Sequence, residues 1–157
     1  MKNNLKIGIL VVGALMLMSS TCSSDDDSNS NNNVNVQELT NISTDGTWMV
    51  TSFVEDGNDE TYHFDNFIFS FNADGSLTAV NDPQIITGMW SITDDSSNDD
   101  DSYSDKDFVI MFNVDETSNF EDLNDDWDIE NYTANKIQLI DVSGGDGSVD
   151  TLVIEKN

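Results

Sequence analysis

Apolar and polar residues alternate in short runs from Asp45 to the C-terminus, and turn residues separate the runs. Phe67, Phe69 and Phe71 recur at every second position, which is typical of a strand with one buried face. The same texture predicts eight strands, at residues 46–54, 62–71, 76–80, 87–93, 107–114, 127–133, 137–142 and 149–154. Tight turns at 72–75 and 133–136 join two pairs of these strands into hairpins.

Helical periodicity is weak along the whole chain, and residues 115–126 have room for one helical turn at most. Short strands at regular spacing are typical of all-β folds. We therefore predict that residues 45–157 form an all-β domain, an eight-stranded antiparallel up-and-down barrel, with a β-sandwich as the alternative. Alternation places these side chains on the inward face: Trp48, Val50, Phe67, Phe69, Phe71, Trp90, Ile92, Phe108, Ile110, Phe112, Trp127 and Ile129.

This predicted inward face is rich in large aromatic side chains. A barrel of eight strands is wide enough either to be filled by side chains or to enclose one small ligand. Each buried aromatic residue removes about 150 to 250 Å² from water and takes up much of the interior. We therefore expect a largely packed interior, with any ligand held at a shallow mouth by Tyr62, Trp90 and Phe112.

The N-terminal residues follow a different pattern. Lys2 and Lys6 precede an unbroken apolar stretch of twelve residues, 7–18, which is shorter than the roughly twenty that a bilayer core requires. A basic start, an apolar centre and a polar end of small residues predict a secretory signal peptide over residues 1–21. Residues 22–44 are polar and low in complexity, so we expect them to form a disordered tether.

The charge balance argues against one class of partner. The sequence has 31 acidic and 5 basic residues, no arginine, and a formal net charge of −26. Removal of Lys2 and Lys6 with the signal peptide takes the charge to about −28. Because nucleic acid binding depends on cationic side chains that displace counterions, we expect none here. Attraction to anionic lipid headgroups is disfavoured for the same reason.

Candidate catalytic and metal-binding residues are few. His63 is the only histidine and Cys22 the only cysteine, so the chain lacks the ligand sets of zinc sites. We expect His63 to be a partly exposed strand residue. No acidic residue occupies a clearly apolar, inward position, where burial would raise its pKa and make it a general acid. Residues 94–107 offer oxygen atoms that suit calcium, but the absence of glycine and of fixed acidic spacing favours a solvated loop. We predict no enzymatic activity, no catalytic residue, no metal site and no cofactor.

Residues 18–22, Met-Ser-Ser-Thr-Cys, resemble the lipobox of bacterial lipoproteins, whose cysteine is acylated and becomes the mature N-terminus. Ser19 and Thr21 depart from the usual box in a way that resembles the looser boxes of Bacteroidetes lipoproteins. The acidic residues 25–27 resemble the signal that sends such proteins to the cell surface. The resemblance implies an outer-membrane protein anchored by acyl chains on Cys22 and exposed at the cell surface. The alternatives are the periplasmic face and an ordinary cleaved signal peptide.

Four segments, 46–48, 69–76, 88–92 and 135–139, resemble small lipocalin-like domains of Bacteroidetes lipoproteins. This resemblance implies a lipocalin-like barrel that binds a small apolar or amphipathic ligand. In lipocalins proper, an arginine of the last strand covers the tryptophan that corresponds to Trp48, whereas this chain has Lys156 nearby. The alternative function is a structural or interaction role in the envelope, with a packed barrel and no small ligand.

Overall fold

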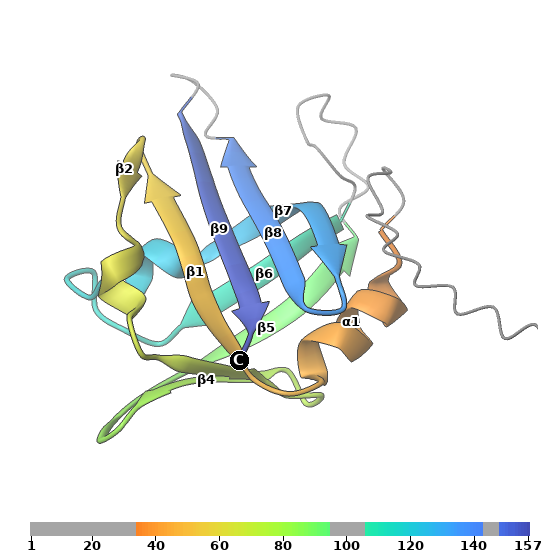
Figure 1. The fold of residues 1–157 in the computed structure, drawn as a ribbon, viewed down its shortest axis with the longest axis horizontal. Helices are drawn as coiled ribbons and strands as arrows, with labels where there is room; N and C mark the ends of the chain where they lie inside the picture. The colour runs from red at the N-terminus through yellow and green to blue at the C-terminus, as the bar shows by residue number, and fades with distance from the viewer. Residues whose placement is uncertain (1–33, 95–105, 143–147) are drawn as a thin grey trace, which may run out of the picture.

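The computed structural model describes residues 34–94, 106–142 and 148–157, whose strands curl into a closed barrel (Figure 1). The helices are α1 (Val36–Thr44) and two short 3₁₀ helices, η1 (Thr61–Phe64) and η2 (Glu121–Leu123). The strands are β1 (Trp48–Glu55), β2 (Asn58–Asp59), β3 (Ile68–Phe71), β4 (Ser76–Asn81), β5 (Gln84–Asp94), β6 (Lys106–Phe112), β7 (Asp125–Thr133), β8 (Lys136–Val142) and β9 (Val149–Lys156).

The sheet closes on itself. Around the barrel the strands follow the order β1-β3-β4-β5-β6-β7-β8-β9, and β9 pairs back with β1. All neighbouring pairs are antiparallel, and β2 is a two-residue addition beside β1. The predicted eight-stranded antiparallel up-and-down barrel is therefore confirmed, and the alternative sandwich of two sheets does not form.

The inward face matches the period-two prediction closely. Of the twelve residues placed there from the sequence, eleven are buried, and Ile92 is partly buried against the same core. Five further apolar residues complete the interior: Leu77, Ile137, Leu139, Leu152 and Ile154. They belong to strands in which apolar and polar residues alternate in the same way. Residues 115–126, which have room for one helical turn at most, contain the single short turn η2.

One predicted strand, residues 62–71, is only partly a strand. Residues 61–64 form η1, and β3 begins at Ile68. The Thr61 hydroxyl accepts a hydrogen bond of 2.9 Å from the Phe53 N–H, which fastens η1 to β1. Asn66 has φ +67°, a left-handed conformation that asparagine tolerates and that interrupts an extended chain. His63 therefore lies on a 3₁₀ helix, and its predicted place on a strand is wrong.

The predicted tether contains a helix at its C-terminal end. Residues 36–44 form α1, so the expectation of disorder up to residue 44 is wrong for this part, while residues 22–33 lie outside the described residues. Asn35 caps α1, since its side chain accepts a hydrogen bond of 3.2 Å from the Glu38 N–H. Leu39 is fully buried in the barrel core. A nine-residue helix is marginal alone, so packing against the barrel holds it.

Two glycines occupy positions where a side chain would be unfavourable. Gly75 has φ +83° in the predicted 72–75 turn, and its N–H donates to the Asn72 carbonyl over 3.0 Å. Gly88 lies where β5 approaches β6 closely, because a Cβ there would overlap the Met111 carbonyl and come within 2.9 Å of the Phe112 Cα. The second position requires glycine for space and the first for conformation.

Candidate functional site

The barrel interior is filled by aromatic side chains. Phe71, Trp90 and Phe108 form one cluster of rings, with centroids 5.3 to 5.5 Å apart. A second cluster connects rings from β1, β3, β6, β7 and η1 with those of the residues just before β3 and η2: Phe53, Phe64, Phe67, Phe69, Phe112, Phe120 and Trp127. These rings occupy the space in which a ligand-binding barrel would hold its ligand.

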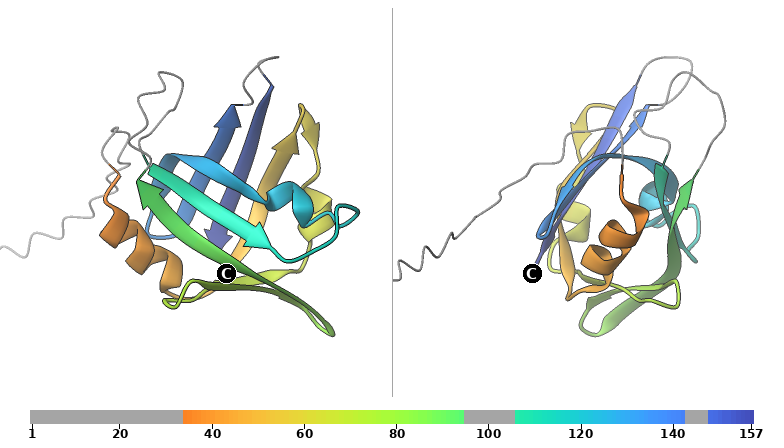
Figure 2. Two further views of the ribbon diagram at one scale, coloured as in Figure 1. Left: turned by 180° about the vertical axis from the view of Figure 1, so that it is seen from behind. Right: turned by 90° about the vertical axis from the view of Figure 1, so that its right-hand side faces the viewer.

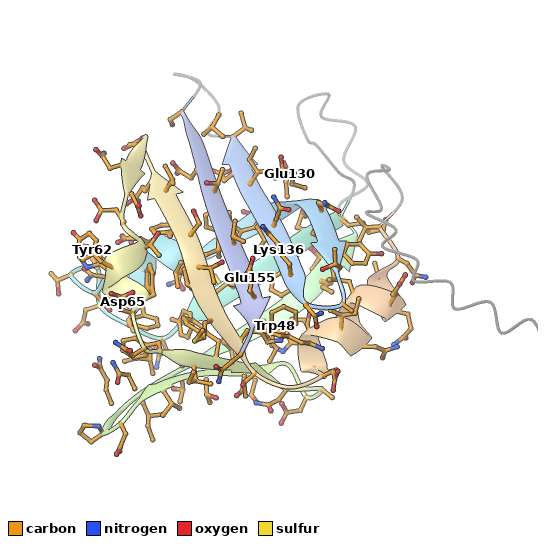
Figure 3. All side chains as sticks on the ribbon, viewed as in Figure 1. Trp48, Tyr62, Asp65, Glu130, Lys136 and Glu155 are labelled. Atoms are coloured by element: carbon orange, nitrogen blue, oxygen red, sulfur yellow. The ribbon has the colours of Figure 1, made fainter. Side chains whose placement is uncertain are left out.

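The three predicted ligand-binding residues do not meet on one surface. Trp90 is 6% exposed, stacks on Phe108, and donates its indole N–H to the Asn72 carbonyl over 2.9 Å. Phe112 is 4% exposed and packs edge-on against Phe69 and Phe120. Tyr62 is 60% exposed on η1, at the outer edge of the molecule (Figure 3). Trp90 and Phe112 therefore contribute to the core, and Tyr62 faces solvent.

Helix α1 lies against one end of the barrel (Figures 1 and 2). There Trp48 is fully buried, and its indole N–H donates to the Ser43 carbonyl of α1 over 2.9 Å. The Lys156 ammonium lies 5.5 Å from the centre of the Trp48 ring and 2.9 Å from an Asp45 carboxylate oxygen. Lys156 thus stands over the tryptophan, and this end contains a paired positive and negative charge.

Helices η1 and η2 lie together at the opposite end (Figures 1 and 2). The Phe64 ring of η1 meets the Phe120 ring beside η2 edge-on, at a centroid distance of 5.4 Å. Phe67 also contacts Phe120, and Leu123 is 1% exposed. These apolar side chains form a plug, which we define as Phe64, Phe67, Phe120 and Leu123. Both ends of the barrel are therefore covered.

Carboxylates surround this plug. Burial raises the pKa of Glu55, and the negative charges of Asp122 and Asp150 raise it further. Burial also raises the pKa of Asp122, against a lowering by His63. His63 Nε2 lies 3.1 Å from Glu60 Oε2, within ion-pairing distance although the two are not aligned as a hydrogen bond. Within the part of the chain that the structure describes, no acidic, histidine or cysteine side chains group in a way that would hold a metal ion.

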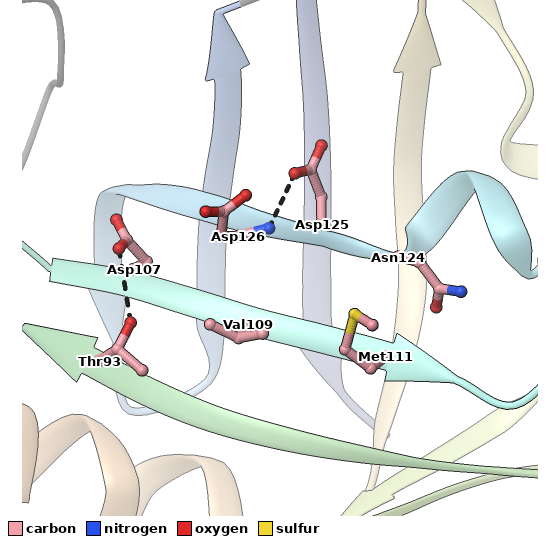
Figure 4. Close-up of a pocket in the computed structure, with 7 residues that line it drawn as sticks. All are labelled: Thr93, Asp107, Val109, Met111, Asn124, Asp125 and Asp126. Atoms are coloured by element: carbon pink, nitrogen blue, oxygen red, sulfur yellow. Dashed lines mark hydrogen bonds between the residues drawn. The ribbon is translucent and has the colours of Figure 1, made fainter. Parts of the chain in front are cut away.

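A groove of about 580 Å³ lies on the outside of the barrel, where β6 and β7 separate (Figure 4). These strands pair from Asp107–Asp128 to Ile110–Asp125, and beyond Ile110 they diverge. The lining side chains come from β5, β6 and the start of β7: Thr93, Asp107, Val109, Met111, Asn124, Asp125 and Asp126. The β7 side of the groove is thus acidic, and the β6 side is apolar except for Asp107 at one end.

Asn124 fixes the acidic side of the groove. Its side-chain amide accepts a hydrogen bond from the Phe112 N–H and donates one of 3.1 Å to the Phe112 carbonyl. This amide pairs with β6 as a further strand residue would, at the point where the backbones separate. The Asp126 N–H then donates to Asp125 Oδ1 over 2.8 Å, which fixes the Asp125 carboxylate against the Asp126 backbone (Figure 4).

Asp125 is the most perturbed carboxylate of the groove. Its pKa is raised from 3.8 to about 6, first by burial, then by a hydrogen bond with the Asp126 side chain and by the negative charge of Asp141. Asp125 is half-buried at the start of β7, two residues before the buried Trp127, and it lines the outer groove.

The wall beside the groove is unusually free of charge. We define the uncharged wall as the outward residues of β3, β4 and β5 with two of β6: Ile68, Ser70, Ser76, Thr78, Val80, Ile85, Thr87, Met89, Ser91, Thr93, Val109 and Met111. The charged Asp107, also outward on β6 and paired with Thr93, borders the wall at one end. Ile85, Met89 and Met111 are 63%, 68% and 50% exposed. The outward side of β7–β9 differs, because it carries charged residues such as Glu130, Lys136 and Glu155 (Figure 3).

The sequence analysis missed this outer surface because it used alternation only to find the core. The outward positions of β5, read the same way, are Ile85, Thr87, Met89, Ser91 and Thr93, and none is charged in a chain with 31 acidic residues. That contrast was available from the sequence. The separation of β6 from β7 was not, because it depends on the loop and the Asn124 side chain between them.

Two predictions fall largely outside the described residues. Cys22 and the signal peptide belong to residues 1–33, and most of the acidic loop 94–107 belongs to residues 95–105. Among the helices of the described ranges, α1 is the longest, and none has the length and apolarity to cross a bilayer.

Comparison with known proteins adds no functional assignment. No family model matches the sequence, and no curated protein matches it. A solved structure of a DUF4847 family protein from Bacteroides vulgatus ATCC 8482 is similar at 17% sequence identity and a TM-score of 0.47. The similarity covers 76% of this chain and 97% of that one.

Proposed function

We propose that this protein is an envelope lipoprotein whose barrel acts as an interaction module through its outer surface and does not hold a ligand inside. Acyl chains on Cys22 would anchor it in the outer membrane, with the barrel exposed at the cell surface. The signal-like leader, the lone cysteine and the acidic residues after it support this location. Two acyl chains give stable anchoring where one gives only marginal binding.

The filled interior is the observation that carries this proposal. Aromatic rings from β1, β3, β5, β6 and β7 contact one another across the barrel, α1 covers one end, and the plug covers the other. A binding function therefore belongs on the outside, where the groove and the uncharged wall are accessible. We assign the protein no catalytic role, because His63 is near a carboxylate but no nucleophile contacts it among the described contacts.

A second candidate function is binding of a small amphipathic molecule in the groove. Its volume of about 580 Å³ lies within the roughly 300 to 1,000 Å³ of ordinary ligand sites. An apolar side and an acidic side would suit a ligand with one apolar and one positively charged part.

Two measurements test the main proposal. For the anchor, the full chain is expressed in a bacterium that processes lipoproteins, and intact mass is compared with that of Cys22→Ser. We expect the wild type to lack residues 1–21 and to carry acyl groups, and Cys22→Ser to carry none. An unacylated wild-type protein would refute the anchor.

For the interaction role, native mass spectrometry of the purified protein checks the interior. We expect the mass of the protein alone. A stoichiometric apolar molecule that survives purification and is lost in a Trp90→Ala variant would contradict the filled interior and restore a ligand-holding function.

A further inference from the structure

We propose that the uncharged wall and the acidic side of the groove together form a docking surface for a basic, amphipathic polypeptide segment in an extended conformation. This inference rests on the proposed function, since it names the class of partner that the outer surface would bind. It combines an apolar strip, a neighbouring pair of carboxylates and the charge of the whole molecule.

The apolar strip runs along β5 and continues onto β6. Ile85 and Met89 point outward from β5, four residues apart, and Met89 is paired with Met111 in the register of β5 and β6. Val80 extends the strip on β4, where it is paired with Ile85. Four residues of strand, with one strand spacing at right angles to them, span about 14 Å. An extended segment of about five residues covers that length.

The strip is exposed and apolar, whereas other parts of the outer surface carry charged side chains. Ile85, Met89 and Met111 are each at least half exposed, and Val80 is 36% exposed. Large apolar side chains gathered on one face indicate an interaction surface more strongly than the same residues scattered singly. The wall threonines and serines between them carry no charge that would oppose burial.

The strip ends at the acidic side of the groove. Val109 and Met111 form its apolar side, and Asp125 and Asp126 lie opposite them (Figure 4). Asp125 is half-buried beside another carboxylate, so its charge is costly there without a compensating cation. An ammonium or guanidinium group in the groove would lie beside both carboxylates and would lower the pKa of Asp125 toward its ordinary value.

Charge complementarity selects the partner. The chain has a formal net charge of −26, so a second copy or an anionic membrane would repel it. A basic segment is attracted over long range, and its apolar side chains can then cover Met89 and Met111. In an extended segment the apolar side chains of one face can cover the strip, and a long, flexible lysine side chain beside the groove can bend to reach Asp125 and Asp126.

The test uses residues 22–157 with Cys22→Ser. This variant carries no acyl group, so it can be studied without detergent. The probe is an eight-residue peptide of alternating Lys and Leu, titrated by calorimetry at about 0.15 M salt, where weak surface attraction is screened. Comparison peptides alternate Lys with Ser, or Glu with Leu. We expect the Lys-Leu peptide to bind at least about tenfold more tightly than Lys-Ser, because leucines gain by burial, and Glu-Leu not to bind.

Matched variants separate this surface from general attraction to an acidic protein. Asp125→Asn with Asp126→Asn should weaken Lys-Leu binding about tenfold. Glu130→Gln with Glu155→Gln, which makes the same change in charge on the outside of β7–β9, should weaken it less than about twofold. Met89→Ser with Met111→Ser should abolish the preference for Lys-Leu over Lys-Ser. The exposed apolar residues Tyr62 and Val149, changed to serine together, should preserve it.

Each other outcome contradicts the docking surface. Equal losses in the two carboxylate pairs would show non-specific attraction. Sedimentation of the free protein as a dimer that Met89→Ser with Met111→Ser dissociates would assign the strip to a second copy. Flotation with uncharged phosphatidylcholine vesicles, lost in the same variant, would assign it to a lipid surface. None of these results bears on acylation of Cys22, so the docking surface can fail while the envelope anchor stands.

Discussion

The two ends of the barrel are closed in different ways. At the α1 end, the buried Trp48 donates a hydrogen bond to the helix, and Lys156 lies between the Trp48 ring and the Asp45 carboxylate. At the opposite end, an apolar plug lies beneath carboxylates whose pKa values are raised by burial and by one another. One end therefore pairs unlike charges, and the other gathers like charges around a packed centre.

This contrast gives the ends opposite responses to pH. The Lys156 ammonium lowers the pKa of Asp45, so that pair stabilises the fold above pH 3.8 and is lost as pH falls through the lowered pKa. The raised pKa values of Glu55 and Asp122 act in the other direction, because the folded state binds those protons more tightly than the unfolded chain does. Mild acid should therefore stabilise the plug end, by protonating its carboxylates, before stronger acid weakens the α1 end.

The largest expected effect comes from opening the plug. Phe120 is 4% exposed and its ring contacts those of Phe64, Phe67, Phe69 and Phe112. Phe120→Ala should lower the free energy of unfolding by about 3 to 5 kcal/mol, through lost burial and the cavity left behind. Urea denaturation followed by tryptophan fluorescence measures this change.

The exposed aromatic residue of the same end provides the control. Tyr62→Ala removes a side chain that is 60% exposed, and should change the free energy of unfolding by about 0.5 kcal/mol or less. If Phe120→Ala were as mild as Tyr62→Ala, the plug would not be a packed part of the core.

A smaller loss is expected at the α1 end. Trp48→Phe keeps an aromatic ring at a fully buried position but removes the indole N–H that donates to the Ser43 carbonyl. The free energy of unfolding should fall by about 2 kcal/mol, from lost volume and the lost hydrogen bond. Because no titrating group is removed, urea denaturation should give the same loss at pH 5 and pH 7. A loss confined to one pH would show that a group titrating between pH 5 and pH 7, and not the packing of Trp48 alone, determines it.

Period-two alternation was sufficient to predict the barrel and its core. Phe69 and Phe71 on one strand and Phe108, Ile110 and Phe112 on another face inward as expected, because a pleated strand sends alternate side chains to opposite faces. The prediction failed where local pattern and tertiary contact disagree. Residues 36–44 have a weak helical signal and are helical because Leu39 enters the core.

The candidate site was much harder to predict than the fold. Trp90 and Phe112 were proposed for a mouth, but alternation says only that a side chain points inward and not whether space remains beside it. The residues that fill this space, Phe64 and Phe120, come from 3₁₀ helices and loops whose positions follow from long-range contacts. The groove likewise depends on how Asn124 fastens to β6.

Asp125 tests the electrostatics of the acidic region. Its pKa is raised from 3.8 to about 6, so its charge opposes folding at pH 7, and this penalty shrinks as pH falls from about 6 and is gone below 3.8. The shift alone corresponds to about 3 kcal/mol, but the group is only half-buried and solvent screening reduces this to roughly 1 kcal/mol. Asp125→Asn should therefore stabilise the protein by about 1 kcal/mol at pH 7 and very little at pH 4.

Thermal unfolding across this pH range provides the measurement. The wild type should gain stability from pH 7 to pH 5, and Asp125→Asn should gain less. Glu130→Gln removes an exposed carboxylate from the outer wall and should leave the pH dependence of the wild type intact. An identical pH dependence in wild type and Asp125→Asn would show that other carboxylates cause the change.

The smallest expected effect concerns the charge above Trp48. Lys156→Met keeps the length of the side chain but removes the ammonium that lies 5.5 Å from the ring centre, so the free energy of unfolding should fall by about 0.5 to 1 kcal/mol. Lys156→Arg should retain the stability of the wild type, because a guanidinium also binds an aromatic face and can pair with Asp45. The Asp45 carboxyl, followed by NMR, should recover its ordinary pKa in Lys156→Met and keep a lowered pKa in Lys156→Arg. An unchanged pKa of Asp45 in Lys156→Met would mean that the pairing of unlike charges does not distinguish this end of the barrel from the other.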